Sequence, residues 1–183
     1  MNSYQINDYP RETFKRAYKR KIHLKIRPKI KNIAIYKSGG GLGDLAQSVI
    51  LFRAFREMFP QAKITYLGLY QHPRCDTLFA NLPYIDEYVE YRRPGKQNSF
   101  KEYFRFLKKY FRKFDLIVDT QSKFAASFYM WLLCPRYFLS RNLIFSRWKI
   151  LIPLNKNIHV VAKMLALARV LGFEKINLDP VID

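Results

Sequence analysis

The sequence predicts an α/β fold in which helices cover both faces of a parallel sheet, and three observations support this prediction. A short apolar segment at 33–36 runs into a glycine-rich turn at 39–43, and an apolar pattern with helical spacing follows at 44–58. Apolar segments of strand length then alternate with helical patterns along the chain. With 183 residues, 49% of them hydrophobic, the chain has enough apolar material for the core of one domain.

The expected elements alternate between strand and helix. Strands are expected at 33–37, 63–69, 86–91, 115–120 and 136–140. Helices are expected at 44–58, 74–80, 100–113, 123–133 and 158–171. Pro135 and Pro153 mark boundaries, and the apolar residues of 141–157 show no period that assigns an element to them. We expect the strand at 33–37 to be central, with the glycine turn at its carboxyl end.

The glycine turn is a candidate ligand-binding corner. Its glycines allow the backbone to approach a ligand closely, and the helix after it presents unpaired N–H groups. The turn does not match a P-loop, because Asp44 stands where that motif requires Lys. It does not match the dinucleotide fingerprint either, since the third glycine would fall on Asp44 and an acidic side chain there repels phosphate. Taken alone, Asp44 is equally well explained as a helix N-cap, a role that does not exclude a chemical one.

The composition is strongly basic. Lys and Arg number 33 against 14 Asp and Glu, which gives a formal charge of +19. Residues 1–31 hold ten basic residues and two acids, a net charge of +8, and form a basic N-terminal arm with no secretory signal pattern; the domain at 32–183 carries the remaining +11. Cys75 and Cys134 have no metal-binding spacing, so we expect free thiols in a reducing compartment.

The expected helix at 100–113 carries two parallel stripes. Its apolar residues fall at alternating four- and three-residue steps, and we expect them to pack on the sheet: Phe100, Phe104, Leu107, Phe111 and Phe114. Basic residues repeat these steps one position later, beside a single acid, Glu102: Lys101, Arg105, Lys108 and Arg112. Tyr103, Phe106 and Tyr110 are expected on the other flank. A basic stripe interleaved with aromatic residues suits an anionic membrane surface, from which high salt should release the protein.

Four segments, in order between residues 31 and 171, share a pattern with one known family. They are the strand, glycine turn and helix at 33–60, the segment 81–87, the strand at 114–121 that ends Asp119-Thr120-Gln121, and the helix at 159–167. Together they resemble glycosyltransferase family 9, the heptosyltransferases of lipopolysaccharide core synthesis. The sequence departs from the family in its three consecutive glycines and at 122–123, where Ser-Lys replaces the common Gly-Asn.

The resemblance implies a Rossmann-like fold at 32–183 that forms the N-terminal, acceptor-side half of a GT-B glycosyltransferase, with the donor-binding C-terminal domain absent. It implies inverting transfer of a sugar from a nucleotide-sugar donor to a lipid-linked glycan acceptor of the lipopolysaccharide-core type. Without a donor domain the chain alone is expected to be inactive. No cofactor is implied, and no D-x-D motif predicts a metal site.

The resemblance also assigns roles to individual residues. Asp44 becomes the catalytic base, and the substrate-binding positions are Ser38, Gly39, Gly40, Gly41, Gly43, Gln121 and Lys123. For Lys123 the alternative is an ordinary exposed lysine at a helix start, and His72, Arg74 and His159 are weaker candidates. The expected location is the cytoplasm, peripheral on the inner face of the membrane. The alternative function is a non-catalytic basic module that binds an anionic membrane or nucleic acid, although no nucleic-acid motif occurs.

Overall fold

The structure is a computed structural model that describes residues 30–37, 42–68, 82–91, 100–121, 123–140, 164–165, 167–168 and 171–172. The elements in chain order are β1 (Asn32–Lys37), α2 (Leu42–Met58), β2 (Lys63–Gly68), β3 (Glu87–Glu90), α4 (Phe100–Tyr110), β4 (Leu116–Asp119), α5 (Phe124–Trp131) and β5 (Tyr137–Ser140). Every predicted strand is present within two residues at each end. The predicted helix at 74–80 lies outside the described residues, as does most of the one at 158–171, of which 164–165 and 167–168 are helical.

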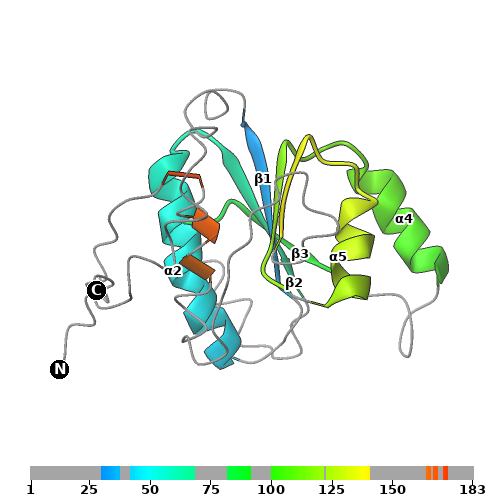
Figure 1. Cartoon of the computed structure of the whole chain (residues 1–183), viewed down its shortest axis with the longest axis horizontal. Helices are drawn as coiled ribbons and strands as arrows, with labels where there is room; N and C mark the ends of the chain where they lie inside the picture. The colour runs from blue at the N-terminus through cyan, green and yellow to red at the C-terminus, as the bar shows by residue number, and fades with distance from the viewer. Residues whose placement is uncertain are drawn as a thin grey trace.

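The strands form one parallel sheet in the order β3-β2-β1-β4-β5, with β1 at the centre as predicted (Figure 1). Ile33 of β1 is in register with Ile64 of β2 on one side and with Leu116 of β4 on the other. The chain leaves β1 toward β2 and β3, and then returns to β4 on the opposite side of β1. The strand order therefore reverses between β1 and β4, and the crevice at the carboxyl ends of such strands is where open α/β sheets bind ligands.

Helices cover both faces of the sheet, which confirms the predicted fold class. Figure 1 shows α2 on one side and α4 and α5 on the other. Because strand side chains alternate between the two faces, Ile33 and Ile35 join the core cluster under α2, and Ala34 and Tyr36 join the cluster under α4 and α5. The helical residues 164–165 and 167–168 pack with the α2 cluster. None of the described helices has the length and apolar character needed to cross a bilayer.

Two aspartates that precede strands fix the register at the amino ends. The Asp115 carboxylate accepts the backbone N–H groups of Lys31 and Asn32, each at 2.9 Å, and so ties the start of β4 to the start of β1. The Asp86 carboxylate accepts the backbone N–H of Ile64 at 2.6 Å and pairs with the Arg56 guanidinium at 2.6 Å. These pairs lie at the edge opposite the predicted ligand site, so we assign them a structural role.

The buried face of α4 differs from the prediction. Phe100, Phe104 and Phe111 were expected in the core, but they are 62%, 61% and 47% exposed. The buried side chains are instead Tyr103 and Tyr110, from the stripe placed on the other flank. Of the predicted apolar stripe, only Phe114 is buried and Leu107 is partly buried.

Tyr103 and Tyr110 can be buried because both rings pack against other aromatic rings and the Tyr103 hydroxyl keeps a hydrogen bond. The Tyr103 hydroxyl donates to the Tyr129 carbonyl of α5 at 3.0 Å, and the two rings lie 4.9 Å apart. The Tyr110 ring stacks on Phe114 at 5.8 Å and contacts Phe106 at 4.9 Å. Since Tyr103 keeps a hydrogen bond inside, burying it costs no unsatisfied polar group.

The helix also ends earlier than the predicted position 113. α4 stops at Tyr110, and Arg112 takes a left-handed backbone conformation with φ of 56°. Its backbone N–H donates to the Leu133 carbonyl at 2.8 Å, which directs the chain into β4. Arg112 therefore lies in the turn after α4, beyond the helical part of the basic stripe, and its guanidinium is 5.3 Å from the Phe111 ring centroid.

Candidate functional site

The candidate site is the carboxyl edge of the sheet, where β1 and β4 end next to each other. Loop residues Ser38, Gly39, Gly40 and Gly41 lie outside the described residues, so their predicted roles stay predictions. α2 begins at Leu42, two residues earlier than predicted, which places Gly43 and Asp44 in its first turn. The expectation that Asp44 is the N-cap of this helix is therefore wrong, because the N-cap precedes Leu42. For Asp44 the structure describes the backbone alone.

The position of Asp44 has an electrostatic consequence. The first turn of a helix carries unpaired N–H groups and the positive end of the helix dipole. α2 is 17 residues long, and its amino end follows directly from the loop after the central strand. A negative charge in this turn interacts favourably with the helix dipole.

A buried carboxylate organises the end of β4. Asp119 is fully buried, and its Oδ1 accepts the backbone N–H of Gln121 at 2.8 Å. Its Oδ2 accepts the Ser140 hydroxyl of β5 at 2.8 Å and the Ser127 hydroxyl of α5 through a short hydrogen bond. Three donors thus satisfy one carboxylate, which is the condition under which a buried charge is tolerated. Asp119 joins β4, β5 and α5 below the candidate site.

Sequence reasoning assigned no role to Asp119, although a signal was present. A polar residue at the end of an apolar strand, followed by serines within otherwise apolar segments at 124–131 and 137–140, is typical of a buried polar cluster. The partners come from three elements, so only the fold shows that they meet.

Gln121 lies at the point where β1 and β4 meet. The preceding residue, Thr120, donates both its backbone N–H and its hydroxyl to the Tyr36 carbonyl, at 3.1 and 2.9 Å. Gln121 is partly exposed, and its side-chain amide reaches the Thr120 hydroxyl at 3.4 Å. The next residue of β1 after Tyr36 is Lys37, whose side chain is 5% exposed. Gln121 and the buried Lys37, which sequence reasoning did not select, therefore both lie at the carboxyl ends of these central strands.

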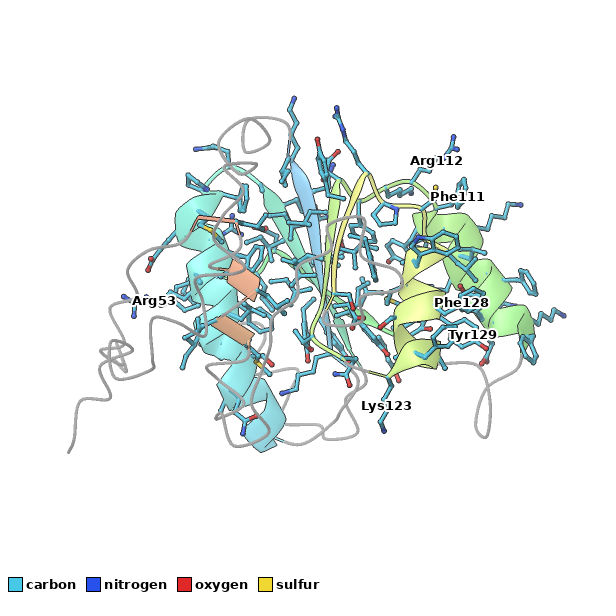
Figure 2. The ribbon with its side chains drawn as sticks, viewed as in Figure 1. Arg53, Phe111, Arg112, Lys123, Phe128 and Tyr129 are labelled. Carbon is cyan, nitrogen blue, oxygen red and sulfur yellow. The ribbon has the colours of Figure 1, made fainter. Side chains whose placement is uncertain are left out.

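Lys123 lies at the start of α5 at the same edge. It is exposed, its backbone is extended (φ −82°, ψ 124°), and its side chain makes no capping hydrogen bond. Figure 2 shows the side chain projecting from the end of the helix, away from the sheet. No acidic residue occupies the first turn of α5. Lys123 is thus placed to meet an anionic group that approaches this edge.

The basic stripe on α4 is exposed, as the sequence suggested. Lys101, Arg105 and Lys108 are exposed on the helix, and Arg112 is exposed in the turn after it. Burial raises the pKa of the Tyr103 hydroxyl beneath them, with a smaller contribution from Tyr129.

The remaining ionisable groups make no second site in the described residues. At the amino edge, the Lys63 ammonium lies 2.7 Å from the Glu87 carboxylate, and this hydrogen bond raises the pKa of Lys63. Cys134 is an exposed free thiol, while Cys75, His72, Arg74 and His159 lie outside the described residues. Among the residues described, no group of three or more His, Cys, Asp or Glu side chains is placed to hold a metal ion.

The sheet order, the covering of both faces and the ligand edge beside the central strand define a Rossmann-like α/β domain. No family model matches the sequence, and no curated protein matches it. Solved structures of similar fold do exist. The glycosyl transferase family 9 protein from Veillonella parvula DSM 2008 is 18% identical with a TM-score of 0.59, and the match covers 79% of this chain and 42% of that one.

Two Escherichia coli proteins have the same fold. The ADP-heptose lipopolysaccharide heptosyltransferase II is 18% identical with a TM-score of 0.51, covering 76% of this chain and 40% of that one. Heptosyltransferase WaaC, solved with ADP, is 13% identical with a TM-score of 0.57, covering 80% of this chain and 49% of that one. The chain therefore spans less than half the length of each structure. The resemblance to family 9 glycosyltransferases is confirmed at the level of the fold.

Proposed function

We propose that this chain is the acceptor-side part of a heptosyltransferase-type glycosyltransferase. The observation that supports the proposal is the start of α2 shortly after the central strand β1, in a fold shared with family 9 enzymes. The basic N-terminal arm at 1–31 and the Rossmann-like domain at 32–183 form this part. In this proposal the nucleotide-sugar is held by a separate donor-binding domain.

The proposed reaction is an inverting transfer. The acceptor hydroxyl oxygen forms a bond to the anomeric carbon of the donor sugar, while the bond from that carbon to the nucleoside diphosphate breaks. The diphosphate leaves with the electron pair of that bond, and the Asp44 carboxylate takes the hydroxyl proton. General-base assistance of this kind contributes about 10²–10⁴-fold to the rate.

The other candidate residues serve to position the acceptor. The loop residues Ser38 to Gly41 and Gly43 let the acceptor approach the backbone closely, and Gln121 offers a hydrogen-bonding amide at the end of β4. Lys123, exposed at the start of α5, pairs with a phosphate or carboxylate of the acceptor. In this proposal the acceptor is a lipid-linked glycan of the cell envelope, and the chain works in the cytoplasm at the inner face of an anionic membrane.

The test compares two substitutions of Asp44 in a form of the protein that includes a donor domain. Asp44→Asn removes the proton acceptor and one negative charge from the first turn of α2, so stability should fall by no more than about 1 kcal/mol while transfer falls by about 10²-fold or more. Asp44→Ala should lose transfer to the same extent, with a similarly small loss of stability. Transfer is measured as nucleoside diphosphate released from an ADP-sugar in the presence of lipopolysaccharide core.

Full turnover by Asp44→Asn would remove the catalytic role of Asp44 and contradict the mechanism. A Lys123→Ala variant serves as the matched comparison, because it should raise KM for the acceptor and leave kcat nearly unchanged.

A further inference from the structure

α4 and α5 carry exposed apolar side chains, and three of them, on or directly after α4, were expected in the core from the sequence. In the part of the chain that the structure describes, the exposed large hydrophobic side chains all lie on these two helices or directly after α4: Phe100, Phe104, Phe111, Phe124 and Trp131. Single exposed apolar residues are ordinary, but a group of them on one face marks an interaction site.

The rings on α5 form a ladder along the helix. Phe128 lies between Phe124 and Trp131, with ring centroids 6.4 Å from each, and the interplanar angles are 4° and 23°. The spacing of four and three residues keeps the three rings on one face of the helix. Phe124 and Trp131 are 55% and 42% exposed, so both ends of the ladder are accessible.

Ring contacts connect this ladder to α4. Phe128 contacts Tyr129 at 5.8 Å, Tyr129 contacts Tyr103 at 4.9 Å, and Tyr103 contacts Phe104 at 6.1 Å. The hydrogen bond from the Tyr103 hydroxyl to the Tyr129 carbonyl holds the two helices together at this point. Ring contacts therefore link the exposed rings of α5 to those of α4 through the buried Tyr103, which holds both sets on a fixed base.

Positive charge borders this surface. Between residues 100 and 113 there is one acid, Glu102, and six basic residues: Lys101, Arg105, Lys108, Lys109, Arg112 and Lys113. Within α4, Lys101 follows Phe100 and Arg105 follows Phe104, and successive helical residues lie about 100° apart around the axis. The basic stripe therefore runs beside these exposed phenylalanines. The Lys109 and Arg112 side chains also lie over aromatic rings, at 5.2 Å from Tyr110 and 5.3 Å from Phe111.

We propose that this face docks on an anionic bilayer by inserting its exposed aromatic side chains between the headgroups while the basic stripe contacts the phosphates. Apolar and basic groups side by side match the two layers of such a surface. A second copy of the chain would bring like charges together. Nucleic acid is disfavoured, because the sequence carries no nucleic-acid-binding motif.

The surface adjoins the candidate site. Phe124 follows Lys123, which projects at the carboxyl edge of the sheet (Figure 2). A bilayer on this face would therefore lie beside the edge where the acceptor is proposed to bind. This inference rests on the proposed function, in which the chain works at an anionic membrane, and it specifies which face of the domain contacts the bilayer. It does not depend on Asp44 or on transfer, so the two proposals fail separately.

The experiment uses Trp131 as its reporter. The chain holds two tryptophans, so Trp148→Phe leaves Trp131 as the only one. On vesicles that mix phosphatidylglycerol with phosphatidylcholine, Trp131 emission should shift to the blue, and lipids brominated near the headgroup should quench it. Binding is measured by co-sedimentation at 0.1 and 1 M NaCl. Because salt screens charges but not apolar contacts, wild-type binding should persist in part at 1 M NaCl.

Matched variants separate the two contributions. Replacing Phe100, Phe104 and Phe111 by Ser should weaken vesicle binding by about tenfold or more and abolish the salt-resistant part, whereas replacing them by Leu should retain most of it. Lys108→Glu should weaken vesicle binding by about fivefold or more, because one basic residue near the headgroups raises the binding affinity by about that factor. Arg53→Glu makes the same charge change on α2, across the sheet (Figure 2), and should have less effect.

Several results would overturn the proposal. They are an unchanged Trp131 emission on saturating vesicles, a Ser variant that binds as tightly as wild type, and equal binding to neutral and anionic vesicles. A blue shift produced without lipid, by RNA or by self-association, would also overturn it and name a different occupant. Should the Ser variant fail to fold by circular dichroism, quenching of Trp131 in the otherwise native chain decides alone.

Discussion

Removing the Asp119 carboxylate should destabilise the domain strongly, although no surface contact is lost. Asp119 is fully buried and accepts hydrogen bonds from the Gln121 backbone and from the hydroxyls of Ser127 and Ser140, both fully buried as well. Asp119→Ala removes the acceptor of all these donors. Hydrogen bonds to the carboxylate offset the free-energy cost of removing these donors from water. Without the carboxylate, that cost lowers the stability of the fold.

The size of the effect follows from which donors find new partners. The two serine hydroxyls are 3.4 Å apart, so one can donate to the other, and Gln121 is exposed enough for its N–H to reach water. The two hydroxyls lose charge-assisted hydrogen bonds worth about 1.5–3 kcal/mol each, and the contact between them recovers part of this loss. We expect a total of roughly 2–5 kcal/mol, a large part of a typical stability of about 5–15 kcal/mol.

The measurement is urea unfolding followed by far-ultraviolet circular dichroism, with the midpoint and the slope both fitted. A triple variant, Asp119→Ala with Ser127→Ala and Ser140→Ala, provides the decisive comparison. Because it removes donors and acceptor together, it should be more stable than Asp119→Ala alone. Ser127→Ala by itself should cost less, since Asp119 then keeps two donors.

Two results would refute this reasoning. One is a loss below about 1 kcal/mol for Asp119→Ala, which would mean that the carboxylate is no better satisfied in the fold than in water. The other is a triple variant whose loss equals the sum of the three single losses, which would show that the groups do not interact.

Two further predictions concern α4. Phe104→Ser should change stability by no more than about 0.5 kcal/mol, whereas Tyr110→Ser should cost about 3–5 kcal/mol, because Tyr110 is buried between Phe106 and Phe114. If thermal unfolding showed a larger loss of stability for Phe104→Ser than for Tyr110→Ser, the phenylalanine face expected from the sequence would be the buried one. Burial raises the pKa of Tyr103 above its ordinary 10.0, so the unfolded chain releases the hydroxyl proton at lower pH than the folded chain does. The contribution of Tyr103 to stability is therefore complete below about pH 10 and is lost as the pH rises further. Tyr103→Phe should reduce that alkaline loss of stability; an unchanged pH profile would show that Tyr103 does not titrate differently in the two states.

The sequence was a good guide to the sheet and a poor guide to the faces of α4. Strands such as β1 are continuous apolar runs bounded by turn residues, and their order along the chain limits the sheet to few arrangements. In α4 two aromatic stripes lie side by side at the same helical spacing, and periodicity alone cannot choose between them. The choice depends on the Tyr129 carbonyl, which α5 brings to Tyr103 across 26 positions of sequence.

The roles assigned to the candidate site residues remain predictions, and the structure describes only the positions of some of them. The loop, Asp44, Gln121 and Lys123 are local features of strand ends and helix starts, and the described part of them falls at one edge of the sheet. The Asp119 cluster could not be predicted, because its members meet only when β4, β5 and α5 have packed. Patterns of residues identify elements, whereas contacts between elements decide which polar side chains share a space.

The central position of β1 also has a consequence for the synthesis of this chain on the ribosome. One neighbour of β1, the strand β2, is synthesised soon after it. The other neighbour is β4, and Leu116, the partner of Ile33, is synthesised 83 residues later. At about 5–20 residues per second that interval is roughly 4–17 s, during which one hydrogen-bonding edge of an apolar strand has no partner. Unpaired edges of this kind recruit other strands. Nascent chains that stall before residue 116 should therefore be the species most dependent on chaperones, and release from them should coincide with the emergence of β4 from the exit tunnel.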